Sequence, residues 1–113
     1  MNDSKDTRQS PQMTTEDRIV EVLRTVYDPE IPVNVYDLGL IYKIDFHEET
    51  GVLDVDMTLT APGCPMADYI VEDVRQKLTG IHDVKEANVN IVFEPAWDET
   101  MMSEQAKADL GIL

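Results

Sequence analysis

The chain has 113 residues, of which 23 are Asp or Glu and 9 are Lys or Arg, so its formal net charge is −14 at pH 7. A chain of this length can bury one hydrophobic core and not two, which excludes a multidomain enzyme. The acidic balance disfavours a nucleic-acid partner, because a polyanion would be repelled and no cluster of Lys or Arg is present to release its counterions.

The N-terminal residues 1–13 have no apolar periodicity, so they predict a disordered tail that precedes a single domain over residues 14–113. The chain shows no signal-peptide segment, and its apolar runs are far shorter than the ~20 residues that a membrane-spanning helix needs. Cys64 is the single cysteine, which excludes an intramolecular disulfide and suits a reducing compartment. We therefore expect a cytoplasmic protein without a membrane partner.

The first predicted element is a helix over about residues 15–27. Thr14 or Thr15 can cap its N-terminus, and Pro29 should end it near Asp28 because proline disfavours helical geometry in the residue before it. Its apolar face consists of Ile19, Val22, Leu23 and Val26.

Alternation of apolar and polar side chains predicts two strands, from Leu40 to His47 and from Leu53 to Thr60, with a polar turn at Gly51 between them. The pair is typical of an antiparallel hairpin. The apolar sides of the two strands consist of Leu40, Tyr42, Ile44 and Phe46, and of Leu53, Val55, Met57 and Leu59.

A second helix is predicted over about residues 65–79, with Gly80 as its C-terminal cap. A third strand follows from Lys85 to Phe93, and a short helix over about residues 103–110 ends the chain. The second helix turns Met66, Ile70, Val74 and Leu78 to one face, and we expect Phe93 and Trp97 to belong to the core.

The element order α-β-β-α-β-α predicts an α+β fold. We expect a two-layer sandwich in which a small mixed three-stranded sheet carries two main helices on one face, with a short C-terminal helix. A crossover from the second strand through the second helix to the third strand would make these two strands parallel.

The turn between the second strand and the second helix carries the candidate reactive group, Cys64. Pro65 suits the first position of a helix, so Cys64 is its predicted N-cap, where the helix dipole favours a thiolate. A reactive or metal-ligating thiol is one interpretation, and a small, partly buried apolar residue at a turn is the other. The hydroxyls of Thr58 and Thr60 precede it and could hold a ligand or ion, or could belong to a solvated strand face.

A second candidate segment is the stiff acidic loop with Asp28 and Glu30 between prolines. These carboxylates could share a metal with Cys64, or they could be solvated. Asp28 follows the predicted first helix, whose dipole disfavours a carboxylate there, so something should compensate it. His47 and His82 lie far apart in sequence, and one cysteine cannot furnish a full set of cluster thiolates. A cluster or metal would be shared across a homodimer, with a partner, or with a small thiol.

Three segments together resemble one family, namely DPEIP with VYDLGLIY at 28–42, TLTAPGCP at 58–65 and EPAW at 94–97. They are similar to the SufT/PaaD-type iron–sulfur assembly proteins, formerly a domain of unknown function. The family includes bacterial maturation proteins, the N-terminal domains of Mrp-type cluster carriers and eukaryotic cytosolic targeting factors. PaaD proteins generally add a cysteine-rich C-terminal segment, which favours the SufT-like branch here.

The resemblance implies a factor that assembles iron–sulfur clusters or delivers them to client proteins, rather than an enzyme. It implies that the functional positions are Asp28, Glu30, Thr58, Thr60 and Cys64. The expected cargo is a transient iron–sulfur cluster or iron, without a tightly bound cofactor, and the expected partners are scaffold or carrier proteins and apo-clients. Two alternatives stay open: a thiol enzyme with Asp28 as the acid–base partner of Cys64, and a cofactor-free interaction adaptor.

Overall fold

The computed structural model of the chain describes residues 13–61 and 67–112. Cys64 and the predicted N-terminal tail, apart from Met13, lie outside the described residues. Helix α1 (Thr15–Leu23) is followed by strands β1 (Ile41–His47) and β2 (Val52–Met57), helix α2 (Ala67–Thr79), strand β3 (Glu86–Ile91), the 3-10 helix η2 (Glu99–Met101) and helix α3 (Glu104–Leu110). None of the described helices is long and apolar enough to span a membrane.

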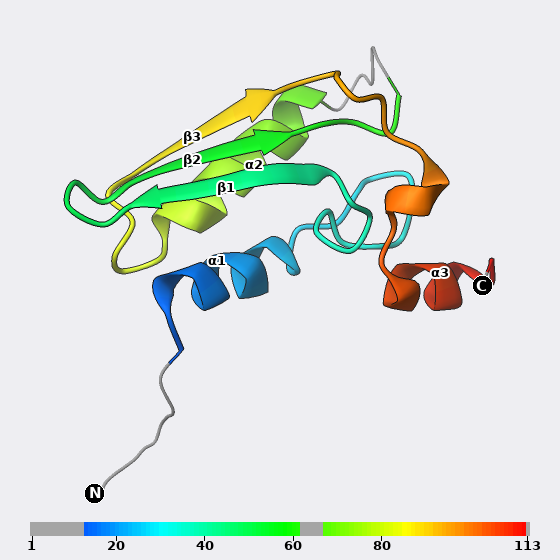
Figure 1. Cartoon of the computed structure of the whole chain (residues 1–113), viewed down its shortest axis with the longest axis horizontal. Coiled ribbons are helices and arrows are strands. Elements are labelled where there is room, and N and C mark those ends of the chain that lie inside the picture. Colours follow the sequence, from blue (N-terminus) through cyan, green and yellow to red (C-terminus); the bar gives the residue numbers. More distant parts are fainter. Residues whose placement is uncertain (1–12, 62–66, 113) are drawn as a thin grey trace, which may run out of the picture.

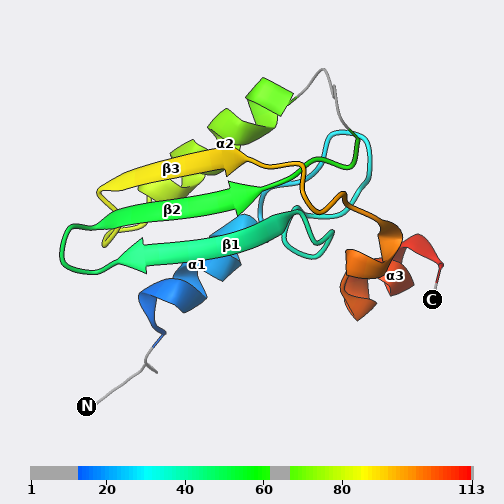
Figure 2. The ribbon, with the colours of Figure 1, turned by 45° about the horizontal axis from the view of Figure 1, so that its top comes forward.

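The sheet has the order β1-β2-β3, with β1 antiparallel to β2 and β2 parallel to β3. Helices α1 and α2 lie together on one face of this sheet, and α3 lies beyond the start of β1 (Figures 1 and 2). The predicted α+β fold with a mixed three-stranded sheet is therefore confirmed. The parallel pairing of β2 with β3, expected from the crossover through α2, is confirmed as well.

The core fills the space between the helices and the covered face of the sheet. Alternate residues of β2 are fully buried there, as their spacing predicted: Leu53, Val55 and Met57. They pack with Ile19 and Leu23 of α1 and with Ile70, Val74 and Leu78 of α2. The other face of the sheet carries polar side chains. One face of the sheet therefore packs against the helices, and the other is open to solvent.

Helix α1 begins as predicted and ends earlier. The Thr14 side chain accepts a hydrogen bond from the Asp17 N–H, and the Asp17 carboxylate accepts one from the Thr14 N–H, which is a capping box. The helix ends at Leu23 and not near residue 27, because the Thr25 N–H and hydroxyl both bond back to the Val22 carbonyl. Val26 is nevertheless buried, so it joins the core from a turn.

The predicted alternation in β1 is wrong at its start. Ile41 pairs with Met57 and Lys43 with Asp56, so Tyr42 is an extra residue in a bulge. Ile41 packs against the core, while the Tyr42 hydroxyl donates to the Pro95 carbonyl. A bulge changes the face of each preceding residue, which a strict period of two cannot predict.

The prediction that Phe93 belongs to the core is wrong, whereas Gly80 directly follows the last residue of α2, where its cap position was predicted. Strand β3 ends at Ile91, and the Phe93 side chain beyond it is 49% exposed. Gly80 follows α2 and donates its N–H to the Lys77 carbonyl, and it is not among the glycines with positive φ. Gly51 lies in the hairpin turn, as predicted, and has φ +76° there.

The C-terminal segment is fixed to the loop that precedes β1. The Trp97 indole N–H donates to the Leu38 carbonyl at 2.7 Å, and the Ser103 N–H donates to the Asp37 carbonyl at 2.8 Å. Trp97 packs against the core and is partly buried, as predicted for this side chain. Gly39 has φ +82° where this loop meets the backbone of Met101. The predicted short C-terminal helix is present as α3, and the segment before it is held against this loop.

Candidate functional site

The acidic loop after α1 is built around the carboxylate of Asp28. Its Oδ1 accepts hydrogen bonds from the N–H groups of Glu30 at 2.8 Å and Ile31 at 3.0 Å, and its own N–H donates to the Val33 carbonyl. The side chain is 9% exposed, whereas Glu30 is exposed. Asp28 therefore holds the loop in shape, and Glu30 presents a carboxylate to solvent.

The expectation that Asp28 stands at the C-terminus of a helix is wrong, because α1 ends five residues earlier at Leu23. The compensation that we expected for its negative charge is nevertheless present. It comes from the two backbone N–H groups of its own loop, since hydrogen bonds to a carboxylate stabilise its charged form.

Thr58 is buried and does not lie on the solvated polar face that the alternation predicted. Strand β2 ends at Met57, and the Thr58 N–H donates to the Leu40 carbonyl at 2.8 Å. The Thr58 side chain is only 1% exposed, while Thr60 is partly exposed. The alternation fails here because the chain leaves the sheet and is covered by other segments.

Those segments enclose a small pocket of about 70 Å³. It is lined by Thr58, Leu59 and Thr60 from the end of β2 and by Phe93, Ala96 and Trp97 from the chain after β3. Two of the sequence motifs, which are far apart in the chain, therefore meet at one point of the structure.

The acidic loop lies at the same end of the sheet as this pocket (Figures 1 and 2). We call this end, with residues 27–40, 58–61 and 92–98, the loop end. In the described part of the chain, no hydrogen bond joins Asp28 or Glu30 to Thr58 or Thr60. Cys64 lies outside the described residues, in the segment that links Ala61 to the described start of α2 at Ala67.

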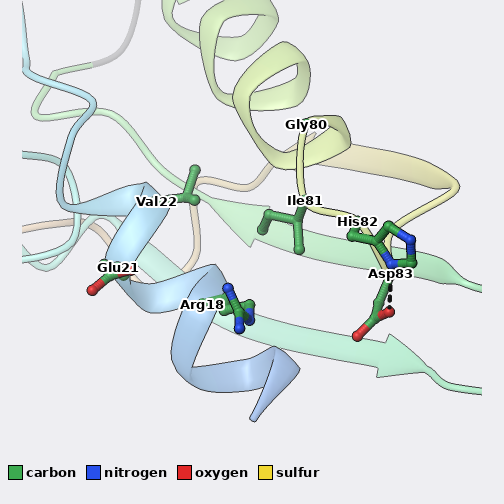
Figure 3. A pocket seen from close by; sticks show the side chains of 7 residues that line it. All are labelled: Arg18, Glu21, Val22, Gly80, Ile81, His82 and Asp83. Atoms are coloured by element: carbon green, nitrogen blue, oxygen red, sulfur yellow. Dashed lines mark hydrogen bonds and ion pairs between the residues drawn. The ribbon is translucent and has the colours of Figure 1, made fainter. Parts of the chain in front are cut away.

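A broader hollow of about 520 Å³ lies elsewhere, between α1 and the connection from α2 to β3. Figure 3 shows Arg18 of α1 on one side of it and Ile81, His82 and Asp83 on the other. The His82 Nδ1 lies 3.2 Å from the Asp83 carboxylate, and charges of both signs line the hollow. None of the site residues predicted from the sequence lines it. His82 is an exposed loop residue.

A cluster on the open face of the sheet was missed by the sequence analysis. His47 Nε2 lies 3.5 Å from Asp45 Oδ2 and 3.2 Å from Asp54 Oδ2. The hydrogen bond from Asn88 lowers the pKa of the Asp54 carboxyl below its ordinary value of 3.8, and the hydrogen bond and charge of His47 and the charge of Lys43 lower it further. The spacing of Asp45 and His47 on one strand was a usable signal, but their approach to Asp54 depends on the hairpin register.

The chain is similar to proteins of known role. The model of a family described as iron–sulfur cluster assembly protein matches residues 16–91. Over 101 residues the chain is 56% identical to a Porphyromonas gingivalis protein named Fe-S protein maturation auxiliary factor, an alignment that covers 89% of this chain and 95% of that protein. It is 45% identical over 87 residues to the Fe-S protein maturation auxiliary factor SufT of Staphylococcus aureus. That alignment covers 77% of this chain and 98% of that protein.

A solved structure agrees with these sequence relatives. The crystal structure of a domain of unknown function, DUF59, from Bacillus anthracis superimposes with a TM-score of 0.81 at 39% sequence identity. The superposition covers 88% of this chain and 93% of that domain.

Proposed function

We propose, from the premise that this chain belongs to the iron–sulfur cluster assembly protein family, that it is an auxiliary factor in the maturation of iron–sulfur proteins. The family predicted from the sequence motifs is thus confirmed. The observation that carries the function is the likeness over most of the chain to maturation auxiliary factors that are themselves covered almost completely.

The geometry of the loop end favours a maturation factor over an enzyme. A pocket of about 70 Å³ is small beside the ~300–1,000 Å³ of pockets that bind small molecules. His47 pairs with Val52, about 17 Å along β2 from Met57, so this histidine is far from the Thr58 segment. His82 lies in the connection between α2 and β3, at the same distant end (Figure 1). A thiol enzyme at the loop end would lack a histidine base.

Within this function, the proposed reactive group is the Cys64 thiolate. It would transiently ligate a cluster or iron, or contact a client, and the cluster or iron is cargo and not a resident cofactor. Asp28 fixes the loop whose exposed carboxylate is Glu30, and Thr58 and Thr60 lie directly before Ala61 at the end of the described strand segment. This arrangement supports a role for Asp28, Thr58 and Thr60 in setting the position and charge of the site. Rigid residues around a site lower the cost of ordering a transient ligand there.

The proposed partners are iron–sulfur scaffold or carrier proteins and apo-client proteins. The formal net charge of −14 favours partners with basic surfaces, because complementary charge speeds the encounter of two proteins. One thiol per chain implies that any bound cluster takes its remaining ligands from a second copy, a partner or a small thiol.

The test in cells is replacement of SufT in Staphylococcus aureus by this chain. We expect wild type to restore the activity of iron–sulfur enzymes relative to iron-free enzymes in the same extract, and Cys64→Ser to fail at equal protein abundance. His82→Gln is the control, because it alters an exposed side chain at the far end. Full restoration by Cys64→Ser would contradict the thiol mechanism and leave the family function in place.

A second test separates a carrier from an adaptor. The full chain and Cys64→Ser are reconstituted anaerobically with iron and sulfide, and iron per chain and the absorption spectrum are measured. We expect substoichiometric iron that depends on Cys64, because a shared cluster occupies more than one chain or thiol. Equal iron in both proteins would contradict ligation by Cys64, and no iron in either protein would indicate an adaptor that recognises clients without holding their cluster.

A further inference from the structure

The open face of the sheet brings three metal-ligating side chains together at the end near the hairpin turn. Asp45 of β1 pairs directly with Asp54 of β2, and His47 lies two residues further along the same face of β1. Backbone register therefore sets their relative positions. We call this group, Asp45, His47 and Asp54, the hairpin cluster.

The distances within the hairpin cluster fit a common metal ion. One ligand atom from each residue lies within 4.8 Å of the other two. His47 Nε2 is 3.2 Å from Asp54 Oδ2 and 3.5 Å from Asp45 Oδ2. Ligands bound tetrahedrally at 2.0–2.2 Å from an ion lie about 3.3–3.6 Å apart, so these two separations are close to those of a coordinated set.

The cluster has support from outside it. The Asn88 side-chain amide of β3 donates to Asp54 Oδ1 at 3.0 Å, which leaves Oδ2 directed to His47. A hydrogen bond of this kind, from a residue that is not itself a ligand, fixes the orientation of a ligating carboxylate. Two carboxylates directly opposite each other on paired strands are also destabilising, and a cation between them would remove that repulsion.

We propose that Asp45, His47 and Asp54 bind a first-row divalent transition metal ion on the open face of the sheet. One imidazole nitrogen with two carboxylate oxygens is a donor set that suits Zn²⁺, Fe²⁺ or Mn²⁺, whereas Ca²⁺ prefers oxygen alone. The three side chains are 39–45% exposed, so water completes the coordination and the ion exchanges readily. This site is at the opposite end of the sheet from the loop end, so its failure leaves the proposed maturation function untouched.

The test is titration of the full chain with Zn²⁺, in a Cys64→Ser background that removes the thiol as a competing ligand. Calorimetry gives the affinity and stoichiometry, and amide NMR spectra locate the site. We expect one ion per chain, with the largest shifts at residues 45, 47 and 54. His47→Gln and Asp54→Asn should each weaken binding by about 10–100-fold or more, and Ca²⁺ should not compete.

His82→Gln is the matched control, because His82 also lies beside one aspartate, Asp83, but lacks a second carboxylate within reach in the described structure. It should bind Zn²⁺ within twofold of the parent. All three substitutions are at partly or fully exposed side chains, and the same NMR spectra report whether each variant is folded. No saturable binding at millimolar Zn²⁺, or equal weakening by His82→Gln, would overturn the proposal and leave the cluster as a hydrogen-bonded contact of His47 with Asp54.

Discussion

The loop end and the hairpin cluster both gather polar side chains, but they hold them in opposite ways. At the loop end, Asp28 is 9% exposed and Thr58 is 1% exposed, and backbone N–H groups satisfy the Asp28 carboxylate. In the hairpin cluster, the side chains of Asp45, His47 and Asp54 contact one another and remain 39–45% exposed to water.

The difference indicates where substitution changes shape and where it changes only charge. Removing a buried carboxylate leaves backbone groups without a partner, which costs more than the loss of an exposed ion pair. We therefore expect variants at the loop end to lower the free energy of unfolding and variants at the hairpin cluster to alter binding or titration with little change in stability.

The largest expected effect is that of Gly39→Ala at the loop end. A Cβ at this position would contact the carbonyl oxygen of Met101, and φ of +82° disfavours any side chain. Strain of about 1–2 kcal/mol from the left-handed backbone and about 1–3 kcal/mol from overpacking predict a loss of about 2–5 kcal/mol in the free energy of unfolding. Urea unfolding measures it.

Gly111→Ala is the control for Gly39→Ala. Gly111 has a similar φ of +74°, but a Cβ there would have nothing within 4 Å. Gly111→Ala should lower the free energy of unfolding only by the strain of the left-handed backbone, about 1–2 kcal/mol. Equal losses at the two glycines would show that the close approach between the loop and Met101 does not stabilise the loop end.

The second effect is that of Asp28→Ala, which we expect to lower the free energy of unfolding by about 2 kcal/mol. The change removes the acceptor of two hydrogen bonds, and hydrogen bonds to a charged group stabilise by about 1.5–3 kcal/mol. Asp28→Asn keeps an acceptor oxygen, so its free energy of unfolding should fall by less than that of Asp28→Ala. Glu30→Ala removes an exposed carboxylate of the same loop and should stay within about 0.5 kcal/mol of wild type. A larger loss for Glu30→Ala than for Asp28→Ala would reverse the roles given to the two acids.

Sequence patterns predicted the fold wherever local periodicity and packing agree. Leu53, Val55 and Met57 alternate and all face the core, because β2 is the central strand, and the bulge in its pairing with β1 adds the extra residue to β1 and not to β2. β1 is an edge strand, and the hydroxyl of its bulged residue Tyr42 contacts Pro95 and Met101, which are more than fifty residues away. Such distant contacts leave no periodic signal in the strand itself.

The same distinction applies to the candidate site. The Asp28 hydrogen bonds join residues two and three positions apart, so a proline-flanked aspartate was enough to single out this loop. Thr58 lies beside the segment after β3, with which it lines a pocket, and the approach of His47 to Asp54 comes from strand register. Neither was readable from neighbouring residues, which is why the first was placed on the wrong face and the second was missed.

The smallest expected effect is at the hairpin cluster, in the variant Asn88→Ala. The Asn88 hydrogen bond is the main cause that lowers the pKa of Asp54 below 3.8, with His47 and Lys43 adding to it. Removing it should raise this pKa toward 3.8, measured by NMR titration of the Asp54 carboxyl in metal-free buffer. A carboxyl whose pKa is lowered by folding stabilises the native state above its unfolded pKa and loses that contribution as the pH falls through the folded pKa. The stability difference between wild type and Asn88→Ala should therefore shrink on acidification below pH ~4.

Asn90→Ala, which removes the longer 3.4 Å hydrogen bond to Asp56, is the matched control and should leave the Asp54 titration unchanged. An unchanged Asp54 pKa in Asn88→Ala would mean that His47, and not Asn88, sets the charge of this cluster.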